Sequence, residues 1–414
     1  MSTENMQINS LDQITNRKDK ELVILLQDLI KIPSWVPQES DEAKKTQNEN
    51  GVVDFLETWV RKNTNMDVTR QSLEGGRFNL IASKGKPDLI FLGHTDTISP
   101  SIGGSYDQLA AEIHDGKIWG RGATDMKSGI ATMLQALSLS PDTNNVWAMF
   151  YADEEFDFLG MKGLIKDYSD LKPKLLVSSD GSDLELGHGC RGLIEFTARV
   201  KGVTGHPAHG NGLNAINGVF TGMTKLRSYL DDYNHPVMGS TSQNLAYLLG
   251  GKENKKSFNK EGLLEVVERE GNVIPDIAEF VVDIRPSSPD LTVESILQKL
   301  ESDVKETGCS FERVKVRHNL GAWYTDLSQI KEFAELAAKA IKQNKVNINK
   351  PGESGYLDLQ MLWEATGRPK AFMFGGGEGA TAHKPDEHIK IENLIKTRDF
   401  FHRLLQEINR DKWQ

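Results

Sequence analysis

Short apolar runs alternate with amphipathic patterns along most of the chain. Apolar side chains recur at helical spacing in residues 21–32, 52–60 and 127–137. Continuous apolar runs, which are typical of buried strands, cover residues 88–92, 146–151 and 175–177. Because these strand-like runs alternate with helical patterns, this part of the sequence predicts a doubly wound α/β layer.

The pattern changes after Gly189, where residues 193–201 alternate like a half-exposed strand. Helical patterns at residues 214–230 and 292–304 then alternate with strand patterns at residues 279–285 and 311–316. This order is typical of a small α/β sandwich. The first pattern resumes near Trp323, with helices at residues 329–343, 357–366 and 391–408 and a strand at residues 371–374.

These changes predict one discontinuous domain, made of residues 20–188 and 323–414, with a smaller domain inserted at residues 189–322. Residues 1–19 are predicted to form a polar arm. The chain has 414 residues, which is enough for about two or three domains of ~150 residues each.

Composition narrows the classes of function. The chain has 49 Lys and Arg against 59 Asp and Glu, a net charge of −10, which disfavours a nucleic-acid binder because that needs a basic face. No apolar run reaches the ~18 residues of a membrane helix, and the polar start lacks the layout of a signal peptide. Cys190 and Cys309 form no CxxC pair, so we expect neither a disulfide framework nor a thiolate zinc site. This cysteine usage favours a reducing, cytoplasmic setting.

Polar residues follow each strand-like run, at the strand ends where α/β sheets bind ligands. His94 and Asp96 follow the first run in the sequence His-Thr-Asp. Residues i and i+2 of an extended segment face the same way, so the carboxylate can fix the tautomer of the imidazole and leave one nitrogen for a metal. The alternative is an ordinary loop histidine beside a solvated aspartate.

Four further positions carry the same kind of chemistry. Asp125 follows a glycine-rich stretch that lacks the Gly-Lys-Ser/Thr ending of a phosphate loop, and its plain alternative is a helix cap. Glu154 and Glu155 follow the second run, where a cation would relieve their repulsion; the alternative is an acidic loop. Asp180 follows the third run, and His383 follows a late glycine-rich loop. A turn aspartate and a surface histidine are their alternatives.

Taken together, two histidines and several carboxylates at successive strand ends suit divalent ions bound through nitrogen and oxygen. A pair of metals shares a bridging carboxylate and holds an attacking water between the two ions. A carboxylate beside that water then acts as the general base.

These motifs resemble a known family. The series G-H-T-D, G-R-G-A-T-D-M-K-S-G, D-E-E, a lone Asp and A-H-K-P-D-E is similar to that of the dinuclear zinc metallopeptidases. That family includes carboxypeptidase G, aminoacylase, acetylornithine deacetylase, succinyl-diaminopimelate desuccinylase and the carnosinase-type dipeptidases. The resemblance spans about residues 20–408, in order and at fitting spacing.

The resemblance implies two divalent metal ions per chain, zinc first, with cobalt and manganese as alternatives. Asp125 would bridge the two ions, Glu154 would be the general base, and Asp96 would orient His94. The remaining ligands would be His94 and Asp180 on one ion, and Glu155 and His383 on the other. The implied fold is an α/β catalytic domain with helices flanking a mixed, largely parallel sheet, plus an inserted α+β sandwich that serves as a lid and dimerisation domain.

In that inserted domain, the resemblance implies that His206 reaches the partner subunit's site of a homodimer and stabilises an oxyanion. Arg285, in the sequence D-I-R-P, would bind a substrate carboxylate. Asn272, in N-V-I-P-D, and Arg191 are further substrate-binding candidates. The alternatives are a surface histidine for His206 and a salt bridge between the domains for Arg191.

Two features bear on the substrate. Many family members have a Trp and a Pro-Phe where residues 101–108 have neither, which affects the substrate and not the metals. In the family that the motifs resemble, Asp at the position of Asp180 tends to accompany true peptidases, whereas Glu tends to accompany deacylases and carboxypeptidases. We therefore expect hydrolysis of short peptides, with deacylation of N-acyl amino acids as the alternative. An inactive metal- or peptide-binding protein and a generic α/β domain are weaker hypotheses, because no base or ligand is missing.

Overall fold

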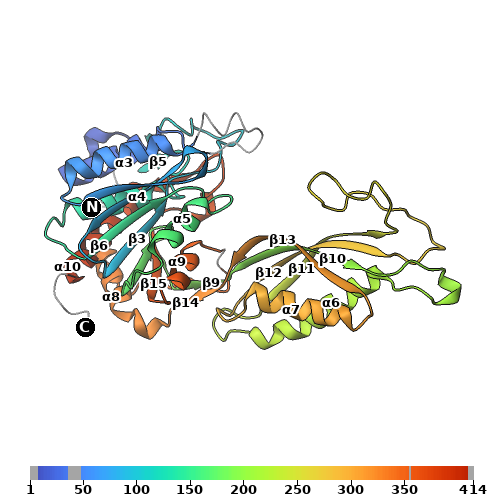
Figure 1. The fold of residues 1–414 in the computed structure, drawn as a ribbon. Coiled ribbons are helices and arrows are strands. Elements are labelled where there is room, and N and C mark those ends of the chain that lie inside the picture. The colour runs from blue at the N-terminus through green and yellow to red at the C-terminus, as the bar shows by residue number, and fades with distance from the viewer. Residues whose placement is uncertain (1–7, 36–47, 354–355, 409–414) are drawn as a thin grey trace, which may run out of the picture. The chain divides into compact units, whose positions relative to one another are not determined.

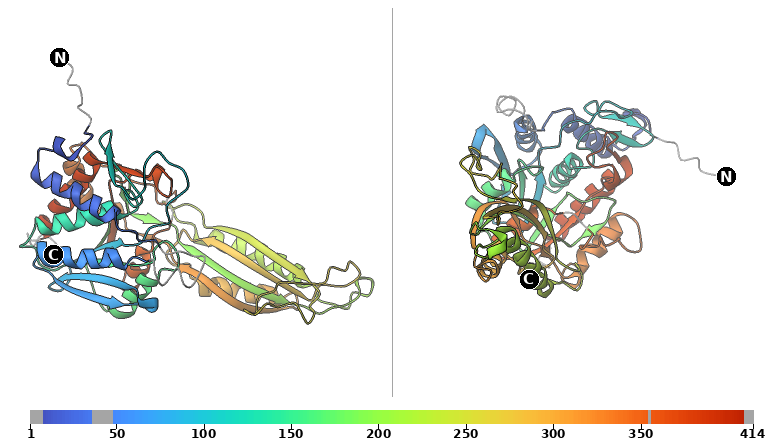
Figure 2. Two further views of the ribbon diagram at one scale, coloured as in Figure 1. Left: turned by 90° about the horizontal axis from the view of Figure 1, so that it is seen from above. Right: turned by 90° about the vertical axis from the view of Figure 1, so that its right-hand side faces the viewer.

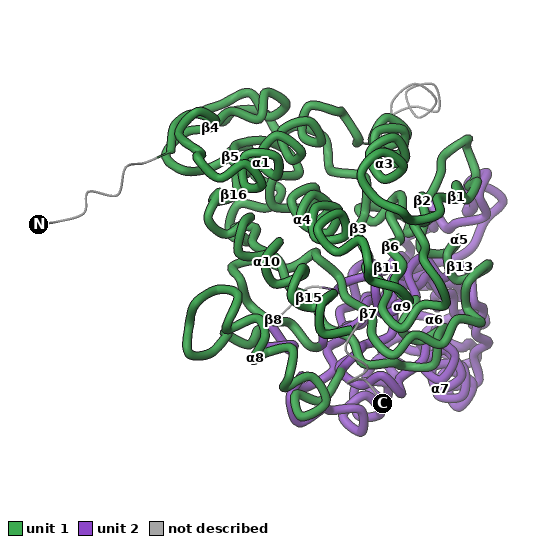
Figure 3. Tube along the Cα trace, turned by 90° about the vertical axis from the view of Figure 1, so that its left-hand side faces the viewer, with its two compact units in different colours: residues 1–188, 325–349, 361–414 green, residues 189–324, 350–360 purple. Residues whose placement is uncertain are grey.

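A computed structural model describes residues 8–35, 48–353 and 356–408. The chain forms two compact units, which Figure 3 shows in separate colours. The first comprises Met1–His188, Thr325–Asn349 and Met361–Gln414, and the second comprises Gly189–Tyr324 and Lys350–Gln360. The chain thus changes unit close to the predicted positions 189 and 322, but the late segment Lys350–Gln360 packs with the second unit, which the sequence pattern did not indicate.

A seven-stranded sheet forms the centre of the first unit, in the order β1-β2-β6-β3-β7-β15-β8 (Figure 1). Its four inner strands, β6 (Val146–Tyr151), β3 (Leu89–His94), β7 (Leu175–Ser178) and β15 (Lys370–Phe374), are parallel. The outer strands β1 (Asp67–Ser72), β2 (Phe78–Lys84) and β8 (Leu186–Gly187) run antiparallel to their neighbours. The predicted mixed sheet with a parallel centre is therefore confirmed.

Helices cover this sheet because its strands are apolar on both faces. All residues of β3 and β7 are buried, and alternate ones such as Leu89 and Phe91 pack in one core with α1, α4 and α10. Among the helices, α4 packs against both α1 and α10, and α3 packs on β1 and β2. The helices of this unit are α1 (Arg17–Ile30), α3 (Asn50–Asn63), α4 (Lys127–Ser138), α5 (Leu159–Tyr168), α8 (Lys331–Ala340) and α10 (Ile391–Ile408).

The N-terminal segment is more ordered than the predicted arm. Residues 1–7 lie outside the described part, a 3-10 turn covers Leu11–Gln13, and α1 begins at Arg17. Ile14 packs in the core of the first unit. A separate three-stranded sheet, in the order β16-β5-β4, joins β16 (His388–Lys390), β5 (Lys117–Trp119) and β4 (Glu112–His114).

The second unit contains a four-stranded antiparallel sheet in the order β11-β12-β10-β13, whose strands are labelled in Figure 1. Figure 2 gives two further views of the ribbon. Side chains from the sheet, α6 and α7 form one core, which includes Phe196, Phe280 and Leu226. The predicted α+β sandwich is therefore present. Its elements are β10 (Leu193–Lys201), α6 (Ala215–Leu230), β11 (Ser242–Gly251), β12 (Ile277–Arg285), α7 (Val293–Lys305) and β13 (Ser310–Leu320).

Short elements complete the chain. The two other strands of the described residues, β9 (Gly189–Cys190) and β14 (Trp323–Tyr324), pair antiparallel, and a short helix, α9, covers Leu359–Ala365. Further 3-10 turns cover Glu74–Gly76, Pro207–His209, Asp231–Tyr233, Leu327–Gln329 and Gly379–Thr381. Both cysteines are buried as free thiols. Among the described residues, no helix combines the length and the apolar character needed to cross a bilayer.

Candidate metal centre

The candidate site lies at the carboxyl ends of the four parallel strands, the edge at which open α/β sheets bind ligands. β3 ends at His94, and Glu154 and Glu155 follow shortly after β6. Asp180 follows β7, and His383 follows β15 after a glycine-rich loop. The sheet thus collects at one edge side chains that are far apart in the sequence.

Five of these side chains form two clusters that share one carboxylate. One ligand atom each of His94, Asp125 and Asp180 lies within 4.8 Å of the other two, and the same holds for Asp125, Glu155 and His383. Asp125 Oδ1 is 2.9 Å from His94 Nε2, and its Oδ2 is 3.1 Å from His383 Nε2. His383 Nε2 is also 3.1 Å from Glu155 Oε1. Each oxygen of Asp125 therefore faces a different cluster, as a bridging ligand requires.

His94 is fully buried, and its two ring nitrogens have different partners. Nδ1 lies 3.0 Å from the backbone oxygen of Asp96, which can only accept, so Nδ1 carries a proton. The carboxylate of Asp96 is farther from Nδ1, at 3.6 Å. Nε2 faces Asp125. Asp96 therefore lies beside Nδ1 of His94, with its backbone oxygen closer than its carboxylate.

The carboxylate of Asp96 has a second task that the sequence did not indicate. Its Oδ1 accepts a hydrogen bond from the backbone N–H of Glu154, and its Oδ2 accepts one from that of Glu155, both at 3.1 Å. Asp96 is fully buried and therefore a fixed support for this turn. One residue thus links the histidine of the first cluster to the turn that carries Glu155 of the second.

The carboxylates of the two clusters shift the pKa values of the histidines beside them. Hydrogen bonds to Asp125 and Glu155 raise the pKa of His383 to about 10. Burial acts to lower the pKa of His94, but the carboxylates of Asp125 and Asp96 outweigh it and raise that pKa well above its usual value. Burial acts to raise the pKa of Asp125, but the two histidines lower it overall. Without metal, protons on the histidines therefore balance the carboxylates.

The donor set fits a pair of divalent cations. Two imidazole nitrogens and three carboxylates suit zinc and similar ions, and none of the five side chains is a thiolate. Burial also raises the pKa of Glu155, which indicates that its negative charge is costly where it stands. Cations at the two clusters would remove that cost.

A buried ion pair between Glu387 and Arg121 holds the backbone at Asp125. Glu387 Oε1 accepts hydrogen bonds from the backbone N–H groups of Thr124, at 2.9 Å, and Asp125, at 3.0 Å. Glu387 Oε2 is 2.5 Å from NH1 of Arg121, and NH2 of Arg121 donates to the backbone oxygen of Lys384, next to His383. Arg121 and Glu387 both lie in the family motifs, but nothing in the sequence pattern indicated this supporting role.

The four remaining candidate residues lie in the second unit: Arg285, Arg191, His206 and Asn272. Arg285 forms a bidentate pair with Asp283, at 2.9 and 3.0 Å, and Arg191 donates two hydrogen bonds to the backbone oxygen of Met238. His206 is exposed, and its Nδ1 accepts a hydrogen bond from the backbone N–H of Ala208. Asn272 is exposed.

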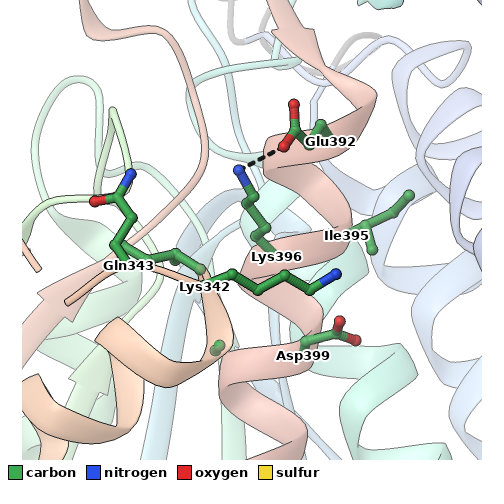
Figure 4. Close-up of a pocket in the computed structure, with 8 residues that line it drawn as sticks. Lys342, Gln343, Glu392, Ile395, Lys396 and Asp399 are labelled. Carbon is green, nitrogen blue, oxygen red and sulfur yellow. Dashed lines mark ion pairs between the residues drawn. The ribbon is translucent and has the colours of Figure 1, made fainter. Parts of the chain in front are cut away.

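A separate surface pocket lies between the end of α8 and α10 (Figure 4). Lys396 forms an ion pair of 2.6 Å with Glu392 at its wall. Its lining residues are Ala340, Ile341, Lys342, Gln343, Glu392, Ile395, Lys396 and Asp399. None of them belongs to either ligand cluster, so this pocket is not part of the candidate metal centre.

Two histidine–carboxylate clusters that share an aspartate at the edge of a parallel sheet have the arrangement expected of a dinuclear metal centre. The model of Peptidase family M20/M25/M40 matches residues 90–407. The chain belongs to this family and is a metal-dependent amide hydrolase. The family resemblance of the motifs is therefore confirmed.

Known relatives match nearly the whole chain. It is 24% identical over 408 residues to acetylornithine deacetylase from Proteus mirabilis, covering 94% of this chain and 97% of the relative. It is 26% identical over 354 residues to succinyl-diaminopimelate desuccinylase from Psychrobacter sp., covering 80% and 82%. The solved structure of the Bacillus subtilis YXEP protein, described as a dinuclear metal-binding peptidase of the M20 family, has a TM-score of 0.62 at 14% identity and covers 95% of this chain and 99% of its own. The fold likeness extends over both units.

Proposed function

We propose that this chain is a two-metal hydrolase that cleaves the amide bond of short peptides. The observation that carries the proposal is the pair of clusters sharing Asp125, with Glu154 on the same turn as Glu155. The proposal takes short peptides as substrates because position 180 is an aspartate, which tends to accompany peptidases in the family that the motifs resemble.

The residues divide into two ligand sets. His94 and Asp180 would hold one divalent ion, Glu155 and His383 the other, and Asp125 would bridge them. Zinc is the first candidate, with cobalt and manganese as alternatives. When bound, such ions supply positive charge that polarises a substrate carbonyl and makes a nearby water more acidic.

Glu154 would move the proton. It takes a proton from the attacking water as the new C–O bond forms, and passes it to the amide nitrogen as the C–N bond breaks. Its side chain is suited to this because the residue is only 8% exposed and its backbone is fixed by Asp96. Asp96 also keeps the Nε2 atom of His94 directed at the cluster through the contact at Nδ1.

The second unit would supply substrate recognition. Arg285 would bind a substrate carboxylate, for which its guanidinium must share or exchange its present partner Asp283. Asn272 and Arg191 are further contacts in this proposal. Dimerisation through the second unit would let His206 stabilise the oxyanion in the partner subunit's site.

Deacylation of N-acyl amino acids is the second candidate, and the names of the two curated relatives favour it. Both reactions use the same proposed ligands and base, so the substrate alone separates them. A peptide and an N-acyl amino acid differ on the side of the amide carbonyl, where a peptide carries a free amino group.

The test is turnover of a matched substrate panel by zinc- or cobalt-loaded protein. The panel contains free dipeptides, C-terminally amidated dipeptides, and N-acetyl and N-succinyl amino acids. Glu154→Gln serves as the inactive variant, and Asp157→Asn as the control, because Asp157 is an exposed carboxylate of the same loop outside both clusters. Dipeptide cleavage that amidation abolishes supports the peptidase and its carboxylate contact. Preference for N-acyl substrates supports the second candidate, and no amide cleavage by metal-loaded protein refutes both.

A further inference from the structure

The turn that carries Glu154 and Glu155 leaves the end of β6, beside the start of β2. These strands are antiparallel, with Leu80 opposite Phe150, so the same register places Arg77 opposite Asp153. Arg77 lies just before β2 and Asp153 just after β6. The edge of the sheet therefore brings an arginine next to the first of three consecutive acidic residues.

Arg77 is held between two carboxylates. Its Nε donates to Glu49 Oε1 at 2.8 Å, and its NH1 donates to Asp153 Oδ1 at 2.9 Å. The side chains of Arg77, Glu49 and Asp153 are 11%, 0% and 6% exposed, so water screens this network little. Glu49 is the N-cap residue of α3, and its backbone oxygen accepts from the N–H of Val53 at 3.1 Å. Arg77 is thus anchored to a helix on one side and bound to the turn on the other.

Asp153 needs such support because its backbone is strained. Its φ is +67°, in the left-handed region that non-glycine residues rarely adopt. Its Oδ2 accepts from the N–H of Leu159 at 3.2 Å, and its backbone oxygen accepts from the N–H of Phe158 at 2.8 Å. The side chain that Arg77 binds therefore also closes the loop that follows the turn.

Asn79 in β2 closes the same loop at its ends. Its Oδ1 accepts from the N–H of Ala152 at 3.0 Å, and its Nδ2 donates to the backbone oxygen of Gly160 at 2.8 Å. A Cβ atom at Gly160 would lie 2.4 Å from the backbone of Ala152, so only glycine fits this closure. The two residues Arg77 and Asn79 therefore hold the loop of residues 152–160 from one side, while Asp96 holds its backbone from another.

We propose that Arg77 is a positioning residue of the hydrolase: through Asp153 it fixes the turn that presents Glu154 and Glu155 to the metal clusters. The proposal rests on the proposed function, in which Glu154 is the general base and Glu155 a ligand. Asp153 and the two glutamates concentrate negative charge on one short turn, and the carboxylate of Asp96 lies against its backbone. Arg77 supplies a positive charge that opposes their repulsion without entering the ligand sets.

The test compares Arg77→Met with Arg77→Lys and with a matched control in the other unit. The control is Arg199→Met, because Arg199 is also a buried arginine, 7% exposed, bound to the carboxylates of Glu279 and Glu312. With saturating metal we expect Arg77→Met to lower kcat roughly 100-fold, as a displacement of about 1 Å can, with KM changed less than about threefold. Arg77→Lys keeps the charge and should recover part of kcat. Arg199→Met should lower the denaturation midpoint and leave kcat unchanged.

A second readout does not depend on activity. Hydrogen exchange of the metal-free protein reports the amides of Glu154 and Glu155, which Asp96 binds. Arg77→Met should speed exchange in residues 152–160 selectively, whereas Arg199→Met should not. If Arg77→Met does not fold, Asp153→Asn tests the same contact, and the same selective effects are expected from the loss of its charge.

The outcomes separate the two proposals. Inactive wild-type protein, or full activity of Glu154→Gln, refutes the proposed function, and exchange at residues 152–160 then still decides whether Arg77 holds the turn. Active wild-type protein with unchanged kcat in Arg77→Met overturns the positioning role. Equal losses of kcat in Arg77→Met and Arg199→Met also overturn it, because they would indicate a general effect on folding.

Discussion

Metal binding at this site should release protons, because the carboxylates raise the pKa of both candidate histidine ligands. His383 has a pKa of about 10 without metal, three units above pH 7, so about one molecule in a thousand has it neutral at pH 7. The pKa of His94 is also raised well above 6.5. Both imidazoles must lose a proton to bind metal. We therefore expect about two protons to be released per chain when both clusters are filled at pH 7.

The assay is titration calorimetry of metal-free protein in buffers with different ionisation enthalpies. The slope of the observed enthalpy against buffer ionisation enthalpy gives the number of protons. His383→Gln should reduce the number of released protons by about one, since this variant keeps His94. The apparent affinity for metal of the cluster that contains His383 should rise about tenfold per pH unit until the pH approaches 10. Release of fewer than half a proton would show that the carboxylates do not hold protonated histidines, and would refute the reasoning.

The same linkage fixes the sign of a stability change. The pKa of His383 rises from 6.5 to about 10 on folding, so its stabilising contribution is complete below pH 6.5 and is lost as pH rises through 10. The metal-free protein should therefore lose unfolding free energy between these values. In the metal-loaded protein this slope should vanish above pH 6.5, because His383 is then neutral in both the folded and the unfolded state and the rise in metal affinity offsets the loss. Parallel urea titrations at several pH values distinguish the two slopes.

Three further outcomes follow from the geometry. Glu154→Gln should keep both metals, measured by elemental analysis, and lose turnover by about 100-fold or more, since the proposed base is not a ligand; loss of metal would contradict that role. Asp125→Ala should lose both metals, because one oxygen faces each cluster; retention of both would show that it is not a bridge. Glu387→Ala should lower the free energy of unfolding by about 3–5 kcal/mol, because it leaves the buried Arg121 unpaired. The exposed pair partner Glu392 is its control, and Glu392→Ala should change that free energy by less than about 1 kcal/mol in urea denaturation.

The sequence predicted the central strands of the large sheet, whose residues are almost all buried. β3, β6 and β7 appear as continuous apolar runs because helices cover both of their faces. β1 was not predicted, because this edge strand reads DVTRQS and five of its six residues are at least partly exposed. β11 was missed for a related reason: its residues are mostly partly exposed and a register shift between Leu245 and Tyr247 interrupts its alternation.

Helix ends were less predictable than helix centres. α1 begins at Arg17 and not near residue 21, because its first turn is polar and depends on Asn16, whose side chain caps the N–H groups of Lys18 and Asp19. Such a cap is one polar residue among many in this segment, whereas the apolar residues that follow are periodic. Hydrophobic periodicity therefore locates the buried face of the helix and gives no signal for its polar start.

The candidate ligands could be found from the sequence because all but Asp125 follow a predicted strand, and Asp125 follows a glycine-rich stretch. Their supports could not, because Arg77 contacts Asp153 only through the pairing of β2 with β6, and the sequence pattern did not predict β2. Glu387 contacts Asp125 across more than 260 residues. A motif specifies which residues face a ligand, whereas the residues behind them are determined by the register of the sheet and the path of the loops.

The supports share one electrostatic principle. Arg121 and Arg77 each bind a carboxylate that lies outside the ligand sets, Glu387 and Asp153, and each of these carboxylates fixes backbone that carries a proposed ligand or the base. An arginine placed directly on Asp125 or Glu155 would instead compete with a divalent ion for the same oxygens. With one carboxylate in between, the positive charge stabilises the folded loops and leaves the ligand oxygens available. Substitution of either arginine should therefore displace the loops that carry the proposed ligands and the base, while all the proposed ligand side chains remain in the chain.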